Sequence, residues 1–389
     1  MQILVSLIKN VLKLLFRYVQ WNFNGVQTPN GEITVERYLL KNEAKKAKLL
    51  SISETSIVKE RLPVSVNSSL PSVFHSLTRR IVPASFILSL PNARVWGAHG
   101  AVVSYSNYLL KDITQKFGDK DKPHLIFNKI FLKKQEFKKG KIAVLATCGS
   151  NVYYHWLFDV LPRLFLLQRK FSLDEVDGII LDFTDLPFQR ETLELLNFDF
   201  NKLIRSNNNW DFHIEAENLL VPSLPSTLGT INKWQCEFLR SSFLPSTKTQ
   251  KFGKYVYISR GIVGRRTIAN EEELLPLLSR LDFQIFNLEQ LSFTDQVNLF
   301  SNADVVVGPH GSGFSNIVFC KPGTTIIDIQ HPDYINTCFW ILSNQLNLCY
   351  HLFFGECGNN NSSSDDNKNK NIFLNLADLE KILQPLICI

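Results

Sequence analysis

The sequence lacks the motifs that mark a metal site or a disulfide framework. Its seven cysteines are odd in number and include no CxxC pair, and its eight histidines are scattered without an HExxH motif. Several cysteines lie inside apolar runs, as buried thiols do. We therefore expect no zinc site, no disulfide framework and a reducing compartment, the cytoplasm.

Long apolar runs and blocks of basic residues are also missing. The apolar N-terminal stretch is interrupted by Lys9, Lys13 and Arg17, so it is too broken to span a bilayer, and it lacks a small-residue cleavage site. Because these cations share one stripe of a helix, residues 1–21 are expected either to lie peripherally on the inner face of a membrane or to dock on the protein itself. A net charge of +6 without basic runs argues against nucleic acid and fits an anionic small ligand.

The 389 residues do contain a regular alternation of strand-like and helix-like segments, typical of an α/β protein. A polar stretch near residue 245 suggests a linker, and the run GNNNSSSDDNKNKN cannot bury enough surface to order itself. The expected organisation is an N-terminal extension (1–75), a first α/β domain (76–245), a second α/β domain (246–357), a disordered loop (358–371) and a C-terminal helix (372–389).

The second half has the clearer pattern, and its strand–helix alternation predicts a parallel, doubly wound sheet. Strands are predicted at Tyr255–Ser259, Phe283–Phe286, Asp304–Gly308, Thr324–Ile329 and Cys349–Phe353. Helices are predicted between them, and Asn270 and Ser292 are the expected N-caps of two of these helices.

The stretch Val305–Asp328 (VVVGPHGSGFSNIVFCKPGTTIID) is the most informative segment. An apolar strand ends at a loop that holds His310, Gly311, Ser312 and Gly313, and a short helix follows. Backbone N–H groups at such a helix start can receive a phosphate, and Asp328, at the end of the next strand, is placed to bind ribose hydroxyls. The pattern predicts a nucleotide-linked ligand; the alternative is a structural turn in which His310 bonds locally.

A second cluster follows the first strand of the same half. Ser259 and Arg260 end that strand, and Arg265 and Arg266 come from the loop behind it. Arginine suits bidentate contacts to oxyanions such as a diphosphate. Beside the glycine loop, this cluster is predicted to contact the phosphates, although arginine clusters alone are usually solvated.

The helix YYHWLFDVLPRLFLL carries the third group. His155, Asp159 and Arg163 recur at a spacing of four on an otherwise apolar helix, so they share one stripe. Ionisable residues on a buried helix need partners or face a polar cleft. The pattern leaves open a site or a self-satisfied core network, and it lacks the third ligand that a metal needs.

Three segments together resemble glycosyltransferase family 61, which includes enzymes of the capsular-polysaccharide type. They are YYHWLFDVLPRL, YVYISRGIVGRRTIANEEEL and LSFTDQVNLFSNADVVVGPHGSGFSNIVFCKPGTTIIDI, and the resemblance covers about residues 93–355. It implies a GT-B-like fold of two Rossmann-like domains facing a cleft, with a nucleotide sugar held mainly by the C-terminal one. Many relatives have Glu where this chain has Asp328, which puts the ribose contact in doubt.

The resemblance implies an inverting, metal-independent transfer of a sugar from a nucleotide sugar, expected to be a UDP-sugar, with no further cofactor. Donor contacts fall on Ser259, Arg260, Arg265, Arg266, His310, Gly311, Ser312, Gly313 and Asp328. His155 is favoured as the base with Asp159 orienting it, Asp159 acting directly is nearly as good, and Arg163 is placed on the acceptor side. The expected acceptor is a glycan or lipid-linked oligosaccharide in cell-surface or capsular polysaccharide synthesis. The alternative is a non-catalytic nucleotide-sugar-binding or scaffold subunit of a polysaccharide assembly complex.

Overall fold

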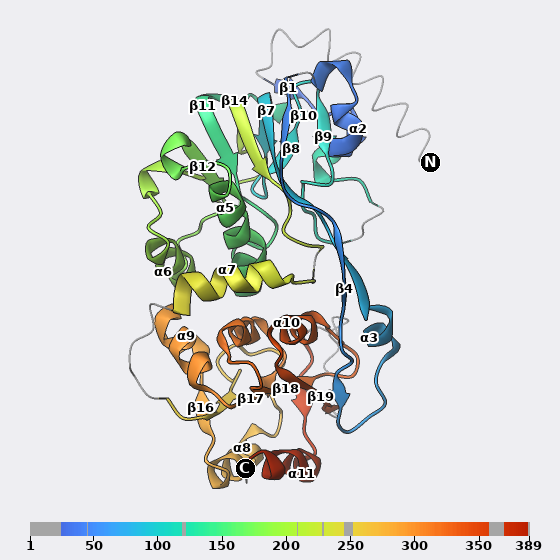
Figure 1. Ribbon diagram of the computed structural model, residues 1–389, viewed down its shortest axis with the longest axis vertical. Coiled ribbons are helices and arrows are strands. Elements are labelled where there is room, and N and C mark those ends of the chain that lie inside the picture. The colour runs from blue at the N-terminus through green and yellow to red at the C-terminus, as the bar shows by residue number, and fades with distance from the viewer. Residues whose placement is uncertain are drawn as a thin grey trace. The chain divides into compact units, whose positions relative to one another are not determined.

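The computed structural model of the chain describes residues 25–44, 46–118, 122–207, 209–227, 229–244, 252–357 and 369–387. These residues form two compact units, each with a large β-sheet of its own (Figure 1). The N-terminal unit takes the described residues up to Glu54, Ala84–Leu186 and Asp199–Leu224. The C-terminal unit takes Thr55–Pro83, Pro187–Phe198 and the described residues from Pro225 onward.

Two predicted segments fall largely or wholly in the undescribed parts of the chain. The basic helix predicted over residues 1–21 and most of the polar loop predicted over 358–371 lie outside the described residues. Among the helices that are described, none is long and apolar enough to cross a membrane.

The sheet of the N-terminal unit is mixed, not parallel throughout. Its described strands run in the order β13-β12-β11-β14-β7-β8-β9-β2, and β3 pairs with β7. The bounds are β2 (Gly31–Ile33), β3 (Lys48–Ser53), β7 (Ser85–Trp96), β8 (Ala101–Val103), β9 (Tyr108–Leu110), β11 (Glu136–Val144), β12 (Gly178–Leu181), β13 (Leu203–Arg205) and β14 (His213–Pro222). Strands β11 to β14 are mutually parallel, whereas β7 is antiparallel to β14, β3 and β8.

The expected doubly wound pattern therefore holds for only one half of this sheet. The link from β7 to β8 is a turn of four residues, Gly97–Gly100, whose two glycines have φ values of 72° and 70°. A parallel crossover needs a dozen or more residues, so a link this short leads only to an antiparallel neighbour. Apolar patterning indicated the strands, but connection length decided their direction.

A long buried helix follows β11, as predicted for residues 152–169. It runs as α4 (Tyr153–His155), a π-helical turn η3 (Trp156–Val160) and α5 (Leu161–Gln168), and α5 packs against β7 and β14. Pro162 has no N–H to donate back to the preceding turn, so the hydrogen-bond ladder is interrupted there. The π turn ends two residues before this proline, and π turns are frequent at functional sites.

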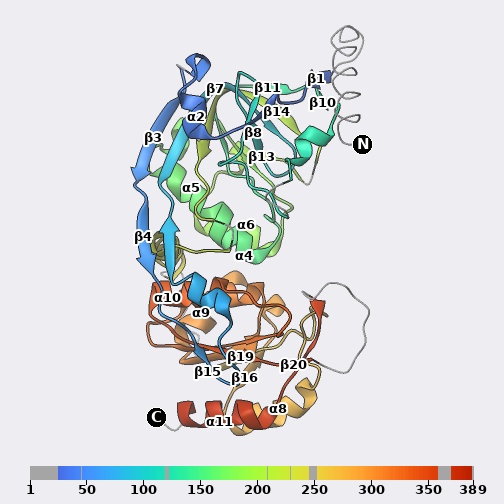
Figure 2. The same ribbon diagram turned by 90° about the vertical axis from the view of Figure 1, so that its right-hand side faces the viewer.

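The C-terminal unit has the predicted parallel sheet. Its described strands run in the order β16-β15-β17-β18-β19-β5, and every neighbouring pair is parallel. The bounds are β5 (Val64–Ser65), β15 (Tyr255–Ile258), β16 (Gln284–Phe286), β17 (Val305–Pro309), β18 (Thr325–Gln330) and β19 (Cys349–Phe354). Figures 1 and 2 show α8 (Glu271–Arg280) and α11 (Leu376–Ile387) on one face of this sheet, and α9 (Phe293–Asn302) and α10 (Cys338–Leu346) on the other.

The two N-caps expected in this unit behave differently. Ser292 caps α9 as predicted, because its hydroxyl accepts from the N–H of Asp295 at 3.1 Å. Asn270 makes no side-chain cap. Its amide instead exchanges two hydrogen bonds of 3.0 Å with the backbone of Leu374, next to β21 (Ile372–Phe373).

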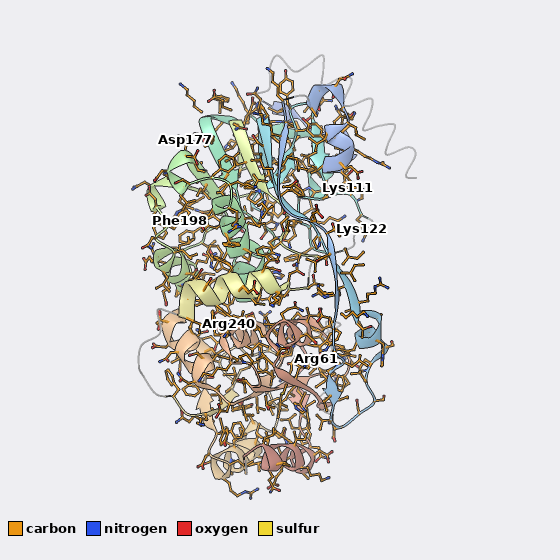
Figure 3. All side chains as sticks on the ribbon, viewed as in Figure 1. Arg61, Lys111, Lys122, Asp177, Phe198 and Arg240 are labelled. Atoms are coloured by element: carbon orange, nitrogen blue, oxygen red, sulfur yellow. The ribbon has the colours of Figure 1, made fainter. Side chains whose placement is uncertain are left out.

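Some segments that were predicted to belong to the N-terminal extension or to the first domain are part of the C-terminal unit. Helix α7 (Lys233–Phe243) packs on α10 and on the 3-10 helix η8 (Ser312–Phe319), and its Arg240 (Figure 3) donates to the carbonyls of Val318 and Cys320 at 2.8 and 2.6 Å. Residues 25–83 do not form a separate extension, since β2 and β3 join the first sheet and β5 joins the second. These contacts are long-range and leave no local trace in the sequence.

Candidate functional site

The parallel sheet of the C-terminal unit has a topological switch point between β15 and β17. From β15 the chain moves to β16 on one side, then returns to β17 on the other. The loops that leave β15 and β17 at their carboxyl ends therefore diverge, and ligands of such sheets bind in the crevice between them. Ser259 and Arg260 follow β15 directly, and His310 and Gly311 follow β17.

The glycines of the second loop permit close approach of other groups. A Cβ on Gly311 would lie 1.7 Å from Nη1 of Arg260, so the arginine head rests against this backbone. A Cβ on Gly308 would lie 2.8 Å from the carbonyl oxygen of Ile258, and one on Gly313 would lie 2.7 Å from Cδ1 of Leu288. The loop thus brings the cationic group onto the start of η8, for which Gly311 is the N-cap. The first N–H groups of a helix have no partner within it.

Arg260 is buried and forms no ion pair with a carboxylate among the described residues. Its side chain is 7% exposed, and its Nε donates to the carbonyl of Arg265 at 3.3 Å. Burial, helped by the nearby charges of Arg266 and Arg265, lowers the pKa of Arg260 to about 10. The guanidinium therefore remains charged at neutral pH, in surroundings that favour the arrival of an anion.

Arg266 is a second cation without a described partner acid. Its backbone adopts the left-handed conformation with φ of 51°, and its buried Nε has no hydrogen-bond partner among the described residues. Its guanidinium lies 5.5 Å from the ring centre of Tyr334, which in turn lies 6.3 Å from the ring of His310. None of the ion pairs between described residues involves Arg260, Arg265 or Arg266, although Arg265 itself is exposed.

Asp328 does not occupy the position expected of a ribose ligand. The carboxylate is fully buried and accepts hydrogen bonds from Nδ1 of His310 at 2.9 Å, the amide of Gln330 at 2.9 Å and the hydroxyl of Tyr350 at 2.8 Å. Burial, reinforced by the charge of Asp328, raises the pKa of Tyr350 well above its usual value, so this hydroxyl stays a donor. With its oxygens committed, Asp328 orients His310 and is not available to a nucleotide.

This arrangement assigns a tautomer to His310. Because Asp328 accepts a hydrogen bond from Nδ1–H, the remaining nitrogen, Nε2, is the atom that can face a ligand. Gln330 is held in turn, since it exchanges two hydrogen bonds of 2.8 Å with the backbone of Asn336. Sequence reasoning missed Gln330 and Tyr350; the first has a visible signal, because alternation along a strand places residues 328 and 330 on one face.

The other predicted donor residues are placed as follows. The hydroxyl of Ser259 accepts from the N–H of Gly261 at 3.2 Å, so it stabilises the loop that carries Arg260. Ser312 is half-buried at the first turn of η8. Two further buried acceptors in this region, Oδ1 of Asn287 and Oγ of Ser315, have no hydrogen-bond partner among the described residues, and neither was predicted.

The N-terminal unit holds the second predicted group, around His155. Nδ1 of His155 lies 2.7 Å from Oδ2 of Asp159, as expected from their spacing on the helix. The amide of Gln115 donates to the same carboxylate oxygen at 3.4 Å, a contact that no sequence pattern indicated. The side chain of His155 is 18% exposed whereas that of Asp159 is only 5% exposed. His155 is therefore the member of the pair that a substrate can reach.

Arg163 does not face an acceptor, contrary to expectation. It is 1% exposed, and its guanidinium donates to the carbonyl of Pro222 at 3.0 and 3.2 Å and to that of Ala146 at 3.0 Å. Burial lowers the pKa of Arg163 to about 9, partly offset by the charge of Asp159. Ala146 follows β11 and Pro222 ends β14, and these strands lie on either side of the switch point of this sheet. The Arg163 side chain thus links the carboxyl ends of the two strands.

The described residues contain no group of three or more His, Cys, Asp or Glu side chains arranged to hold a metal ion. Polar chemistry at the switch point of the C-terminal sheet rests instead on arginine, imidazole and backbone N–H groups.

Comparison with known proteins matches residues 153–327 to the family model described as glycosyltransferase 61. The chain is 23% identical to the EGF domain-specific O-linked N-acetylglucosamine transferase of Drosophila melanogaster over 204 aligned residues. These residues cover 46% of this chain and 39% of that protein. It is 34% identical over 64 residues to the β-1,2-xylosyltransferase of Arabidopsis thaliana, covering 16% of this chain and 12% of that protein. The chain thus spans well under two thirds of the length of either relative.

Proposed function

Because residues 153–327 form a glycosyltransferase 61 domain, we propose that the chain is an inverting glycosyltransferase. It moves a sugar from a nucleotide sugar, expected to be a UDP-sugar, to a glycan acceptor hydroxyl in cell-surface or capsular polysaccharide synthesis. Both relatives named above carry transferase names and support the reaction class. The context of cell-surface polysaccharide rests on the resemblance of the sequence motifs.

The main support for a donor site in the C-terminal unit is a set of cationic side chains at the switch point of its sheet. Arg260 and Arg266 are half-buried or buried, have no described carboxylate partner, and come from the loop after β15. His310 and the start of η8 come from the loop after β17. A diphosphate supplies oxyanions to these guanidinium groups, which suit bidentate contacts to it.

The same cations give the leaving group its stabilisation. As the bond to the sugar breaks, negative charge grows on the diphosphate, and preorganised donors aimed at that charge lower the barrier. Arg260, Arg266 and His310, through its Nε2, take this role without a metal ion or other cofactor. Asp328 holds His310 in the required tautomer and so acts through it.

His155 serves as the base in this proposal. The acceptor oxygen forms a bond to the anomeric carbon while the bond from that carbon to the diphosphate oxygen breaks, and the electron pair leaves with the nucleoside diphosphate. The acceptor proton passes to Nε2 of His155, while Asp159 receives the hydrogen bond from Nδ1–H and stabilises the imidazolium. The burial of Asp159 and its contacts with His155 and Gln115 favour this assignment over Asp159 acting directly.

Calorimetric titration with UDP tests the donor side. Arg260→Ala should weaken UDP binding about 10- to 150-fold, because a hydrogen bond to a charged group contributes roughly 1.5–3 kcal/mol. Arg280→Ala is the matched control, since Arg280 forms an exposed ion pair with Glu380 on α11. Equal affinity of the Arg260 and Arg280 variants would remove the phosphate role.

Turnover with a panel of UDP-sugars tests the catalytic side. His155→Asn should bind UDP like the wild type and lose turnover by about two to four orders of magnitude, the usual contribution of a general base. His75→Asn, at an exposed histidine of α3 (Ser72–Ser76), is the control. EDTA should leave the rate unchanged. Full activity of the His155 variant would point to another base, and UDP binding without turnover in the wild type would point to a non-catalytic subunit.

A further inference from the structure

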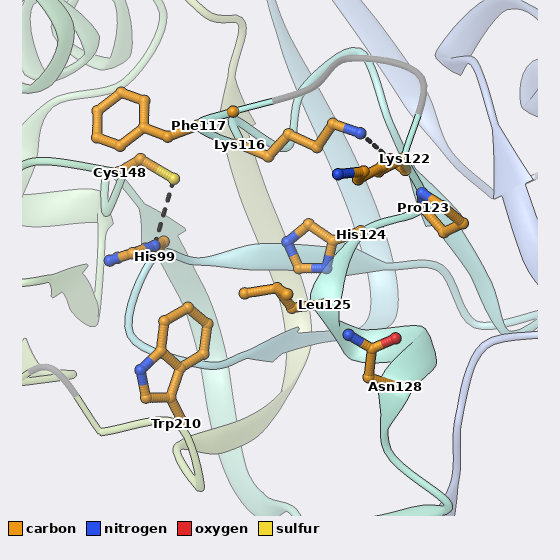
Figure 4. Close-up of a pocket in the computed structure, with 11 residues that line it drawn as sticks. His99, Lys116, Phe117, Lys122, Pro123, His124, Leu125, Asn128, Cys148 and Trp210 are labelled. Carbon is orange, nitrogen blue, oxygen red and sulfur yellow. Dashed lines mark hydrogen bonds between the residues drawn. The ribbon is translucent and has the colours of Figure 1, made fainter. Parts of the chain in front are cut away.

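A cavity of about 490 Å³ lies within the N-terminal unit. This volume is in the range of small-molecule pockets. The residues that Figure 4 shows around it come from the turn after β7, from residues 116–118 and 122–128, and from the loops after β11 and β13. The walls used in the argument are formed by His99, Phe117, His124, Asn128, Cys148 and Trp210.

Trp210 provides a rigid aromatic wall. Its ring lies 4.9 Å from that of His99 and 5.9 Å from that of Trp96. Gly97, with φ of 72°, gives it room, since a Cβ there would lie 3.3 Å from Cε3 of Trp210. The side chain nevertheless remains 38% exposed. A large aromatic surface that is fixed in place and still open to solvent is suited to contact with the apolar face of a ring.

Two lysines, Lys116 and Lys122, line the cavity, and its other polar groups include two imidazoles and a thiol. Burial lowers the pKa of His124 to about 4 and lowers the pKa of His99 as well. Nδ1 of His124 accepts from the N–H of Ile126 at 3.2 Å, which leaves Nε2–H as its donor. Burial raises the pKa of Cys148 to about 11, so this residue stays a thiol.

The thiol also defines the tautomer of His99. Cys148 donates its proton to the carbonyl of Gln115 at 3.2 Å, so its sulfur is the acceptor for Nδ1 of His99 at 3.3 Å. His99 then keeps Nε2 as an acceptor. Beside Lys116 and Lys122, the cavity therefore carries one neutral imidazole donor, one neutral imidazole acceptor and the amide of Asn128. Hydroxyl groups, which both donate and accept, match this set.

The cavity shares its wall with the His155–Asp159 pair. The ring of Phe117 lies 5.0 Å from the ring of His155, and a Cβ on Gly149 would touch both rings at 2.9 and 2.8 Å. Gln115, whose carbonyl accepts from Cys148, donates through its side chain to Asp159. A molecule in this cavity is thus separated from the candidate base by one aromatic side chain.

We propose that this cavity is the acceptor subsite and that it takes a sugar ring of the acceptor glycan, stacked against Trp210 and hydrogen-bonded by His99 and His124. The inference rests on the proposed function for its catalytic meaning, but the binding of a sugar ring does not. It also assigns a role to Phe117, which closes the cavity toward His155.

Saturation-transfer NMR on the full chain tests the proposal, with the methyl β-pyranosides of glucose, galactose, xylose and N-acetylglucosamine as probes. At least one probe should receive saturation from the wild type and from Tyr105→Ala, an exposed aromatic control in the same unit. Trp210→Ala should reduce the signal about 3- to 10-fold, as expected for loss of an aromatic contact. Asn128→Ala, at an exposed position of the wall, is the second variant if removal of Trp210 prevents folding.

Two outcomes would overturn the proposal: no transfer to any probe, or transfer that neither Trp210→Ala nor Asn128→Ala reduces. UDP titration of the same samples separates the two proposals. Loss of UDP binding with retained sugar binding would reject the donor site alone, and retained UDP binding without sugar binding would reject the cavity alone.

Discussion

Substitution of Gly311 by alanine tests the contribution of Arg260 to donor binding while the arginine itself is kept in the sequence. Gly311 has a φ of −176°, an extended conformation open to any residue, so alanine introduces no backbone strain. Its Cβ would, however, lie 1.7 Å from Nη1 and 2.6 Å from Cζ of Arg260. The guanidinium must therefore leave its position on the loop, which a flexible side chain can do at low cost in folding stability.

The expected result is weak binding by a well-folded protein. Loss of the charge-assisted contact from Arg260 to the diphosphate should raise the dissociation constant of UDP about 10- to 150-fold, from roughly 1.5–3 kcal/mol. The midpoint of thermal unfolding without ligand should stay close to that of the wild type. Gly308→Ala provides the contrast, because its Cβ would meet the backbone carbonyl of Ile258 at 2.8 Å. That contact requires strand movement and should destabilise the fold by about 1–3 kcal/mol.

A double-mutant cycle, with UDP affinity measured by calorimetry, shows whether Gly311→Ala acts through Arg260. If Gly311→Ala acts only by displacing Arg260, the double variant with Arg260→Ala should bind UDP as weakly as Arg260→Ala alone. Additive losses would mean that the loop itself forms the contact. Unchanged affinity in Gly311→Ala would refute the placement of the diphosphate beside Arg260.

Two further predictions concern the N-terminal unit. Arg163→Met should lower the free energy of unfolding by roughly 3–5 kcal/mol in urea denaturation. The reason is that it removes the Arg163 donors from two buried carbonyls and the neighbouring cation from Asp159. A loss below about 1 kcal/mol would contradict a structural role of Arg163. Burial lowers the pKa of both His124 and His213 to about 4, so the unfolded chain binds more protons between pH 4 and about 6.5 and stability should rise with pH in that window. His213→Gln should flatten this rise, whereas an unaltered slope would show that His213 is not buried in its neutral form.

Local pattern was enough to predict the parallel sheet of the C-terminal unit. Its strands are continuous apolar runs separated by helical segments, and such runs are typical of strands buried on both faces. The pairing of His155 with Asp159 was predictable for a similar reason, since residues four apart meet on one face of a helix. The position of Arg260 and His310 at the same edge of the sheet followed from the shared direction of the strands that they follow.

The roles of Asp328 and Arg163 were not predictable in this way. Both are charged residues at the carboxyl ends of strands or beside them, where ligands often bind. Whether such a group faces a ligand or the interior depends on which donors or acceptors arrive from distant segments. Tyr350, which donates to Asp328, lies on the neighbouring strand β19. Pro222, which accepts from Arg163, lies 59 residues after it in the chain.

The sequence by itself determined where strands and helices form, which residues follow the strands of the parallel sheet, and which side chains share the face of the His155 helix. These properties depend on spacing over a few residues and on the apolar period. Only the tertiary structure decided which strands of the first sheet are antiparallel. It also decided that residues 55–83 and α7 belong to the C-terminal unit, and it alone forms the cavity beside Trp210. Those features are set by connection length, burial and hydrogen bonds between segments far apart in the chain, and no local pattern records such contacts.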